Sequence, residues 1–134
     1  MKPYSQTDNW SCLAMSAAHI AGDENLESFI EYACHDGSMF VQGSTHPDGR
    51  MGFILEEARG FLASRGIELV EITTEDYPQE PAALLSVAVP QWPMNSHWIA
   101  WSGGEHYEPH PRYKGREFTE YPIVSAWAAR RRNP

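Results

Sequence analysis

The sequence predicts an α+β fold, with helices in the first half of the chain and an antiparallel sheet in the second. Apolar residues recur at helical spacing as far as residue 64, and short segments bounded by turn residues follow from residue 67. Near the end, the segment His97–Trp101, a Ser-Gly-Gly turn and a returning segment indicate a β-hairpin. The chain has 134 residues, so we expect residues 1–134 to form a single domain.

Three helices are expected in the first half. The first covers Cys12–Ala21, which is rich in helix formers and is followed by Gly22, a residue that commonly ends helices. The second covers Glu24–Ala33, with Asp23 as its N-cap and apolar residues along one face. The third covers Met51–Ser64, which also carries an apolar face.

The rest of the chain is expected to form loops and short strands. A long loop over residues 36–50 is predicted either to form one lip of a substrate cleft or to be a plain surface insertion. Further expected elements are a strand over 67–72, a helical turn over 82–85, strands over 86–89 and 121–128, and a solvated basic tail over 130–132.

Cys12 is a candidate nucleophile because of its place at the start of a helix. Unpaired backbone N–H groups and the helix macrodipole favour an anion there, and both lower the pKa of a thiol. Asp8, Asn9 and Ser11 are competent N-caps just before it. Gln6, six residues upstream, can donate a hydrogen bond to an oxyanion. The alternative is structural, since a cysteine in an alanine-rich helix is most often a core residue.

His97 and Glu108 are the candidate base and orienting carboxylate. In an antiparallel hairpin the start of one strand lies near the end of the next, so Glu108 can reach the imidazole of His97. A register slip of one residue would instead turn Glu108 to solvent, and His106, His110 or a residue of the preceding loop would then face the ring.

The order of these residues resembles that of papain-like cysteine peptidases, in particular the small bacterial and phage branch that includes the bacteriocin-leader (double-glycine) processing peptidases. The resemblance rests on Gln6, Cys12 at a helix start, His97 opening a late strand, and Glu108 followed by Pro109. It implies a papain-like fold in which Cys12 is the nucleophile, His97 the base and Gln6 the oxyanion-hole donor. The third group falls on Glu108, where the family usually has Asp or Asn.

The function expected from these residues is that of a cysteine peptidase or isopeptidase acting on a peptide or protein. Trp10, Trp98 and Asn95 flank the candidate site in sequence and are expected to contact the substrate. The many aromatic residues suit a cleft for an extended chain, although core packing explains them equally well. Two alternatives remain open: amidase or transglutaminase-like acyl transfer, because the His-strand-turn-acid segment also resembles transglutaminase-like domains, and an inactive peptide-binding module.

Composition and charge exclude several other classes. A formal net charge of -8 argues against nucleic-acid binding, which depends on neutralising phosphates. The sequence shows no leader-like apolar segment and no apolar run of membrane-spanning length, so a cytoplasmic protein with reduced cysteines is expected. His106 and His110 have the spacing of helical zinc ligands, but neighbouring prolines argue against a helix, so neither a metal nor a cofactor is expected.

Overall fold

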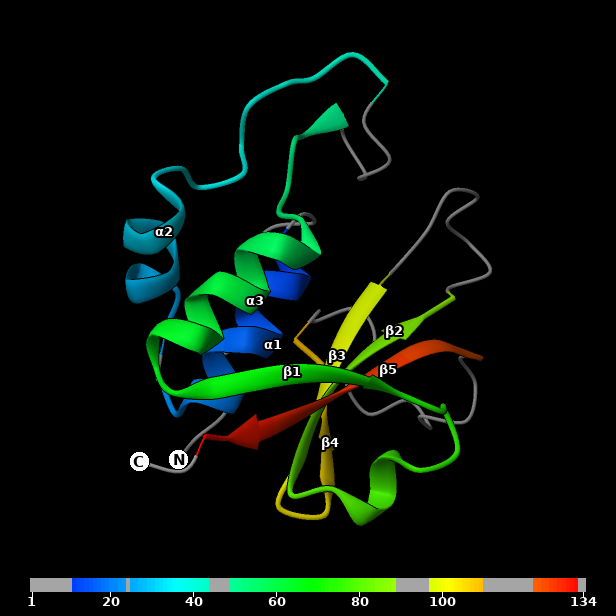
Figure 1. Ribbon diagram of the computed structural model, residues 1–134. Helices are drawn as coiled ribbons and strands as arrows, with labels where there is room; N and C mark the ends of the chain where they lie inside the picture. Colours follow the sequence, from blue (N-terminus) through cyan, green and yellow to red (C-terminus); the bar gives the residue numbers. More distant parts are fainter. Residues whose placement is uncertain (1–10, 24, 44–48, 89–96, 110–121, 133–134) are drawn as a thin grey trace.

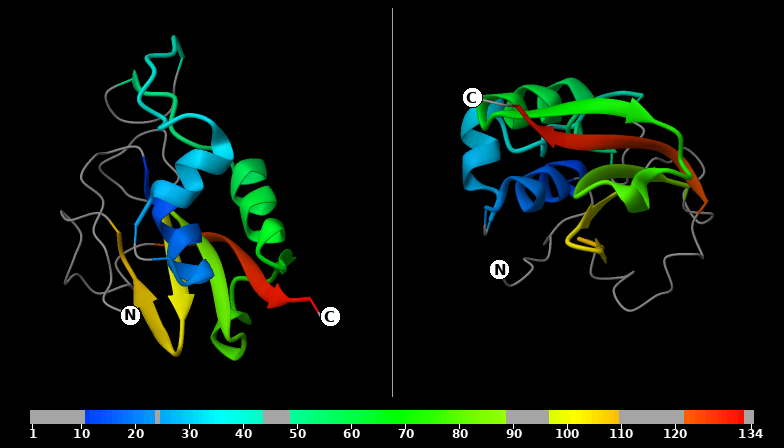
Figure 2. Two further views of the ribbon diagram at one scale, coloured as in Figure 1. Left: turned by 90° about the vertical axis from the view of Figure 1, so that its left-hand side faces the viewer. Right: turned by 60° about the horizontal axis from the view of Figure 1, so that its bottom comes forward.

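The computed structural model of the protein describes residues 11–23, 25–43, 49–88, 97–109 and 122–132. These residues form three α-helices and one antiparallel sheet of five strands, which confirms the predicted α+β class. The helices gather on one side of the sheet, as two of the views show together (Figures 1 and 2). The sequence order of the elements, helices first and sheet last, is also as predicted.

Helix α1 (Cys12–Ala21) has the predicted bounds and lies in the middle of the molecule. Gly22 ends it in the left-handed conformation, with φ of 86°, and its N–H donates to the carbonyl oxygen of His19. All but two of its residues are buried, because the sheet covers one side of the helix and helices α2 and α3 cover others. A helix of small residues such as alanine permits this close packing on several sides.

Helix α2 (Glu27–Ala33) begins three residues later than predicted, and the prediction of Asp23 as its cap is wrong. The side-chain oxygen of Asn25 accepts a hydrogen bond from the N–H of Glu27 at 2.9 Å, so Asn25 rather than Asp23 binds the first N–H of the helix. The carboxylate of Asp23 pairs with Arg65, with an N–O distance of 2.9 Å.

Helix α3 (Leu55–Ser64) begins four residues later than predicted because the preceding residues pair with a loop. The N–H of Met51 donates to the carbonyl of Met39 at 2.7 Å, and the N–H of Gly52 donates to that of Gly37 at 2.9 Å. Gly52 has a φ of 64°, which interrupts a right-handed helix. Residues 37–43 and 49–53 therefore form an extended arm above the start of α3 (Figure 1).

The sheet has the strand order β1-β5-β2-β3-β4, and every neighbouring pair is antiparallel. A short 3-10 helix, Tyr77–Gln79, connects β1 to β2. A turn at Gly103 and Gly104, both with positive φ, joins β3 to β4 as predicted. The strands are β1 (Ile67–Ile72), β2 (Ala82–Val87), β3 (His97–Ser102), β4 (Glu105–Tyr107) and β5 (Ile123–Arg131).

The predicted helical turn over 82–85 is wrong, because these residues begin the central strand β2. Alanine and leucine favour helices in isolation, but β2 pairs with β3 on one side and with β5 on the other. Leu84 and Leu85 point to opposite faces of the sheet, and both are fully buried. Tertiary pairing and burial on both faces therefore override the local helical preference.

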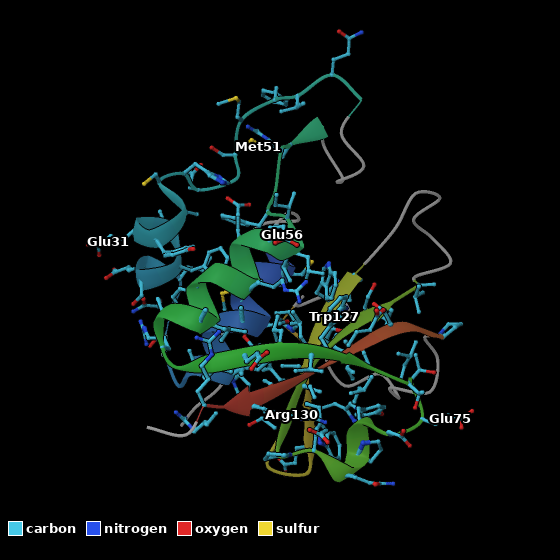
Figure 3. The ribbon with its side chains drawn as sticks, in the orientation of Figure 1. Glu31, Met51, Glu56, Glu75, Trp127 and Arg130 are labelled. Atoms are coloured by element: carbon cyan, nitrogen blue, oxygen red, sulfur yellow. The ribbon has the colours of Figure 1, made fainter. Side chains whose placement is uncertain are left out.

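The predicted basic tail is also wrong in part, because β5 continues to Arg131 and pairs with β1 as far as Ile67. The guanidinium of Arg130 (labelled in Figure 3) pairs with the carboxylate of Glu80, with an Nε–Oε1 distance of 2.9 Å. On the same strand Trp127, also labelled there, packs against the helix-side core. The end of the chain up to Arg131 is thus part of the sheet.

The core has two parts, one on each face of the sheet. The larger part lies between the sheet and the helices, where Phe29 and Phe61 pack with their ring centroids 4.9 Å apart. The smaller part lies on the opposite face and includes Tyr77, Leu85 and Ile99. None of the helices in the described residues is long and apolar enough to cross a membrane.

Candidate active site

Cys12 is the first residue of α1, and its side chain is 2% exposed. The N–H of Met15 donates to the carbonyl of Ser11 at 2.8 Å and closes the first helical turn. Backbone N–H groups of a first turn have no acceptor within the helix, so they and the macrodipole favour a negative charge at this position. Cys12 therefore occupies a helix position that is typical of reactive cysteines.

His97 is the first residue of β3, and its side chain is fully buried. The Nε2 atom of His97 is hydrogen-bonded to the Oε1 atom of Glu108, which directly follows β4. The hairpin register explains this contact. Ala100 pairs with Tyr107, so Glu108, one residue further, turns to the side of the hairpin that His97 also occupies. The hairpin thus has the predicted register, in which the side chains of His97 and Glu108 meet.

The Cys12 thiol is the second group that acts on the His97 side chain, because it raises the pKa of the imidazole together with Glu108. Glu108 itself is bound at the Nε2 atom of the ring. Both Cys12 and His97 are the first residues of their elements, which allows them to meet where the start of α1 lies against the start of β3. The imidazole therefore lies between a thiol and a carboxylate.

The surroundings of His97 raise its pKa to about 9. Burial has the largest single influence and lowers the pKa, because it disfavours the charged ring. The hydrogen bonds and charges of Cys12 and Glu108 together outweigh burial. The ring is accordingly a positively charged imidazolium at neutral pH.

Of the other four predicted site residues, the structure describes only Trp98. Gln6, Trp10 and Asn95 lie outside the described residues. Trp98 is partly buried, and its side chain packs against the helix-side core, so at least part of it has a structural role.

Two polar residues of α1 were missed by the sequence reasoning. The hydroxyl of Ser16 donates to the backbone carbonyl of Trp98 at 3.2 Å. The ring of His19 stacks on that of Tyr107, with centroids 4.0 Å apart and planes at 9°. Ser16 and His19 follow Cys12 by four and seven residues, so they lie on the same face of a helix that is otherwise apolar. This spacing is the sequence signal that could have identified them.

No family model matches the chain, and no curated protein matches it in sequence. The chemistry of the site must therefore be argued from its own geometry.

The histidine that was considered as a metal ligand is engaged elsewhere. The Nε2 atom of His106 is hydrogen-bonded to the hydroxyl of Tyr77 at 2.8 Å, and its ring lies against Trp101, with centroids 4.8 Å apart. His110 lies outside the described residues. Across the part of the chain that the structure describes, no group of three or more His, Cys, Asp and Glu side chains could hold a metal ion.

Both cysteines are free thiols in different environments. Cys12 is buried beside His97, whereas Cys34 is exposed at the end of α2, in the left-handed conformation with φ of 64°. The Cys34 thiol contacts the backbone carbonyl oxygens of Glu31 and Tyr32, at 3.7 Å and 3.9 Å. Of the two thiols, Cys12 alone lies beside a base and at a helix start in the described structure.

Proposed function

We propose that the protein is a thiol-dependent hydrolase that cleaves an amide bond of a peptide or protein, as a cysteine peptidase or isopeptidase. The observation that carries the proposal is the placement of the His97 ring between the Cys12 thiol and the Glu108 carboxylate. Nucleophile, base and orienting group in mutual contact are the parts that nucleophilic acyl transfer requires.

The proposed reaction has two steps. The Cys12 thiolate attacks the substrate carbonyl carbon, and the tetrahedral intermediate collapses as His97 gives its proton to the leaving amine, which forms a thioester. His97, now neutral, takes a proton from a water molecule that attacks the thioester, and collapse of the second tetrahedral intermediate releases the carboxylic acid product and restores the Cys12 thiolate beside protonated His97. Glu108 holds the ring orientation and stabilises the imidazolium without taking the proton itself.

An oxyanion forms in each step and needs hydrogen-bond donors. The backbone N–H of Cys12 belongs to the first turn of α1 and is suited to this role. We propose Gln6 as the second donor, on the basis of its spacing from Cys12 in sequence.

The proposal includes a papain-like arrangement of the fold. Its support is a cysteine-bearing helix that packs against an antiparallel sheet, with His97 opening one strand and the acidic residue following the next. A glutamate at the third position departs from the family pattern by one methylene. Contact between Glu108 and His97 supports the view that the longer side chain can fill this role.

A peptide substrate is supported by the exposed apolar residues of the arm. Phe40 is 69% exposed, and Met39 and Val41 beside it are also exposed. The guanidinium of Arg50 lies 3.9 Å from the centroid of the Phe40 ring, which ties the two sides of the arm together. The arm projects from the end of the molecule at which α1 begins (Figures 1 and 2), so its apolar side chains are suited to contact a chain bound at Cys12.

The test is a search for cleaved peptides. Purified protein is incubated with a diverse peptide mixture, and new termini are identified by mass spectrometry. We expect cleavage products with the wild-type protein and with Cys34→Ala, but none with Cys12→Ala. Products in which an added amine is joined to the acyl group would indicate a transferase instead. If the wild-type protein bound peptides without converting any, the inactive-module alternative would replace the proposal.

A further inference from the structure

Helix α1 carries Cys12, Ser16 and His19 along a single stripe. Residues at i, i+4 and i+7 of an α-helix lie on one face, and Ser16 and His19 are the polar residues that follow Cys12 in this helix. Each of the three contacts the β3–β4 hairpin, which also carries His97 and Glu108.

Ser16 binds the backbone of β3 next to the candidate base. Its side chain is fully buried, and its hydroxyl donates to the carbonyl of Trp98, 82 residues away in sequence, at 3.2 Å. Trp98 directly follows His97. This hydrogen bond therefore fixes the distance between the helix and the strand one turn below the Cys12 thiol.

His19 packs on β4 next to the orienting carboxylate. Its ring stacks on Tyr107 with centroids 4.0 Å apart and planes at 9°, and Tyr107 directly precedes Glu108. Burial lowers the pKa of His19, so the ring is neutral at neutral pH and suited to packing against an aromatic face. The stack anchors the end of β4 about two turns below Cys12.

We propose that Ser16 and His19 are positioning residues that hold α1 on the β3–β4 hairpin, so that Cys12 stays within reach of His97 while His97 stays on Glu108. The inference rests on the proposed function and deepens it. Each contact is made one residue away from His97 or Glu108, so a shift of the helix at either place moves the thiol relative to the ring. A displacement of about 1 Å can lower a reaction rate by about 100-fold.

The experiment uses the full chain with Cys34→Ser, so that Cys12 is the single thiol. The pH dependence of Cys12 alkylation by iodoacetamide is measured, and the titration of His97 is followed by NMR of its imidazole. Ser16→Ala and His19→Ala remove the two contacts, whereas His19→Phe keeps a ring for the stack. Ser64→Ala is the matched control, because Ser64 also donates to a backbone carbonyl, that of Phe61, but within α3.

We expect Ser16→Ala and His19→Ala to slow alkylation at about pH 6 by about tenfold or more, because the thiol is no longer held against the His97 ring. The pKa of His97 should fall from its raised value in both variants. His19→Phe and Ser64→Ala should retain both the parent alkylation profile and the parent His97 titration. Thermal unfolding of every variant separates this effect from a loss of stability, which alone does not move a pH profile.

Folded Ser16→Ala and His19→Ala variants with the parent alkylation profile and the parent His97 titration would overturn the proposal. If Ser16→Ala did not fold, the test would rest on His19→Ala and His19→Phe. The same alkylation profile and the same His97 titration in these two variants would overturn the proposal. An ordinary thiol profile in the parent would instead contradict the proposed function. The NMR titration distinguishes the two failures, because it reports the contacts of His97 whether or not Cys12 reacts.

Discussion

His97 and Glu108 lie eleven residues apart in the chain and share a hydrogen bond between Nε2 and Oε1. The hairpin between them is short, so its length and register decide whether the two side chains meet. Cys12 also acts on this ring, because both Cys12 and Glu108 raise its pKa. The hydrogen bond to Glu108 thus helps to fix the orientation of the ring.

Replacing Cys12 by alanine is expected to abolish hydrolysis and to leave the fold intact. Alanine fits the buried start of α1, because it is smaller than cysteine and favours a helix. Activity is measured on the peptides identified as substrates, and circular dichroism checks the fold. Cys34→Ala is the control and should retain full activity, because Cys34 is exposed at the end of α2. Activity that persists in Cys12→Ala would place the nucleophile elsewhere.

Replacing Glu108 by glutamine is expected to lower kcat by up to about 10⁴-fold, because an amide cannot stabilise the imidazolium and can favour the wrong tautomer. Glu108→Asp keeps the charge on a side chain one methylene shorter, so an intermediate rate is expected. Glu105→Gln, at the exposed start of β4, is the matched control and should have no effect. An unchanged kcat in Glu108→Gln would remove Glu108 from the mechanism.

Replacing Gln6 by alanine is expected to slow turnover by about a hundredfold or more, equivalent to about 2.7–4 kcal/mol, through the loss of one oxyanion donor. The effect should fall on kcat rather than on KM, because the oxyanion forms only in the reaction. Steady-state kinetics on one peptide substrate are sufficient. A purely KM effect would instead make Gln6 a substrate-contacting residue.

The raised pKa of His97 predicts a pH-dependent stability. A group whose pKa is higher in the folded than in the unfolded protein stabilises the fold in full below the unfolded value of about 6.5. This contribution is lost as the pH rises through the folded value of about 9. Denaturant unfolding across this range should therefore show a larger loss of stability for the wild-type protein than for His97→Gln. Parallel curves for the two proteins would contradict the raised pKa.

Local sequence was sufficient to predict some of the elements and to suggest the candidate site. The bounds of α1 follow from its alanine content and Gly22, and those of β1 from its alternating residues. The contact between His97 and Glu108 was foreseen because a short hairpin leaves few possible registers.

The remaining features depend on contacts between distant segments. Residues 82–85 are a strand because β3 and β5 pair with them, which their own helical preference does not indicate. Helix α3 starts late because Met51 and Gly52 pair with the arm. The contact of Ser16 with Trp98 joins residues 82 positions apart, and its existence depends on how α1 packs on the sheet.

The central claim is that His97 activates Cys12 as the nucleophile, and competition between the two cysteines for iodoacetamide tests it directly. Cys34 serves as the internal reference, because it is exposed and its thiol contacts backbone carbonyl oxygens, whereas Cys12 is 2% exposed. At about pH 6 an ordinary thiol with a pKa of about 8.5 is almost entirely protonated. Mass spectrometry of the digested protein then gives the alkylation rate at each site. The account predicts that Cys12 is modified first, despite its burial, and that His97→Gln abolishes this preference. Preferential modification of Cys34, with a Cys12 rate that His97→Gln leaves unchanged, would contradict it.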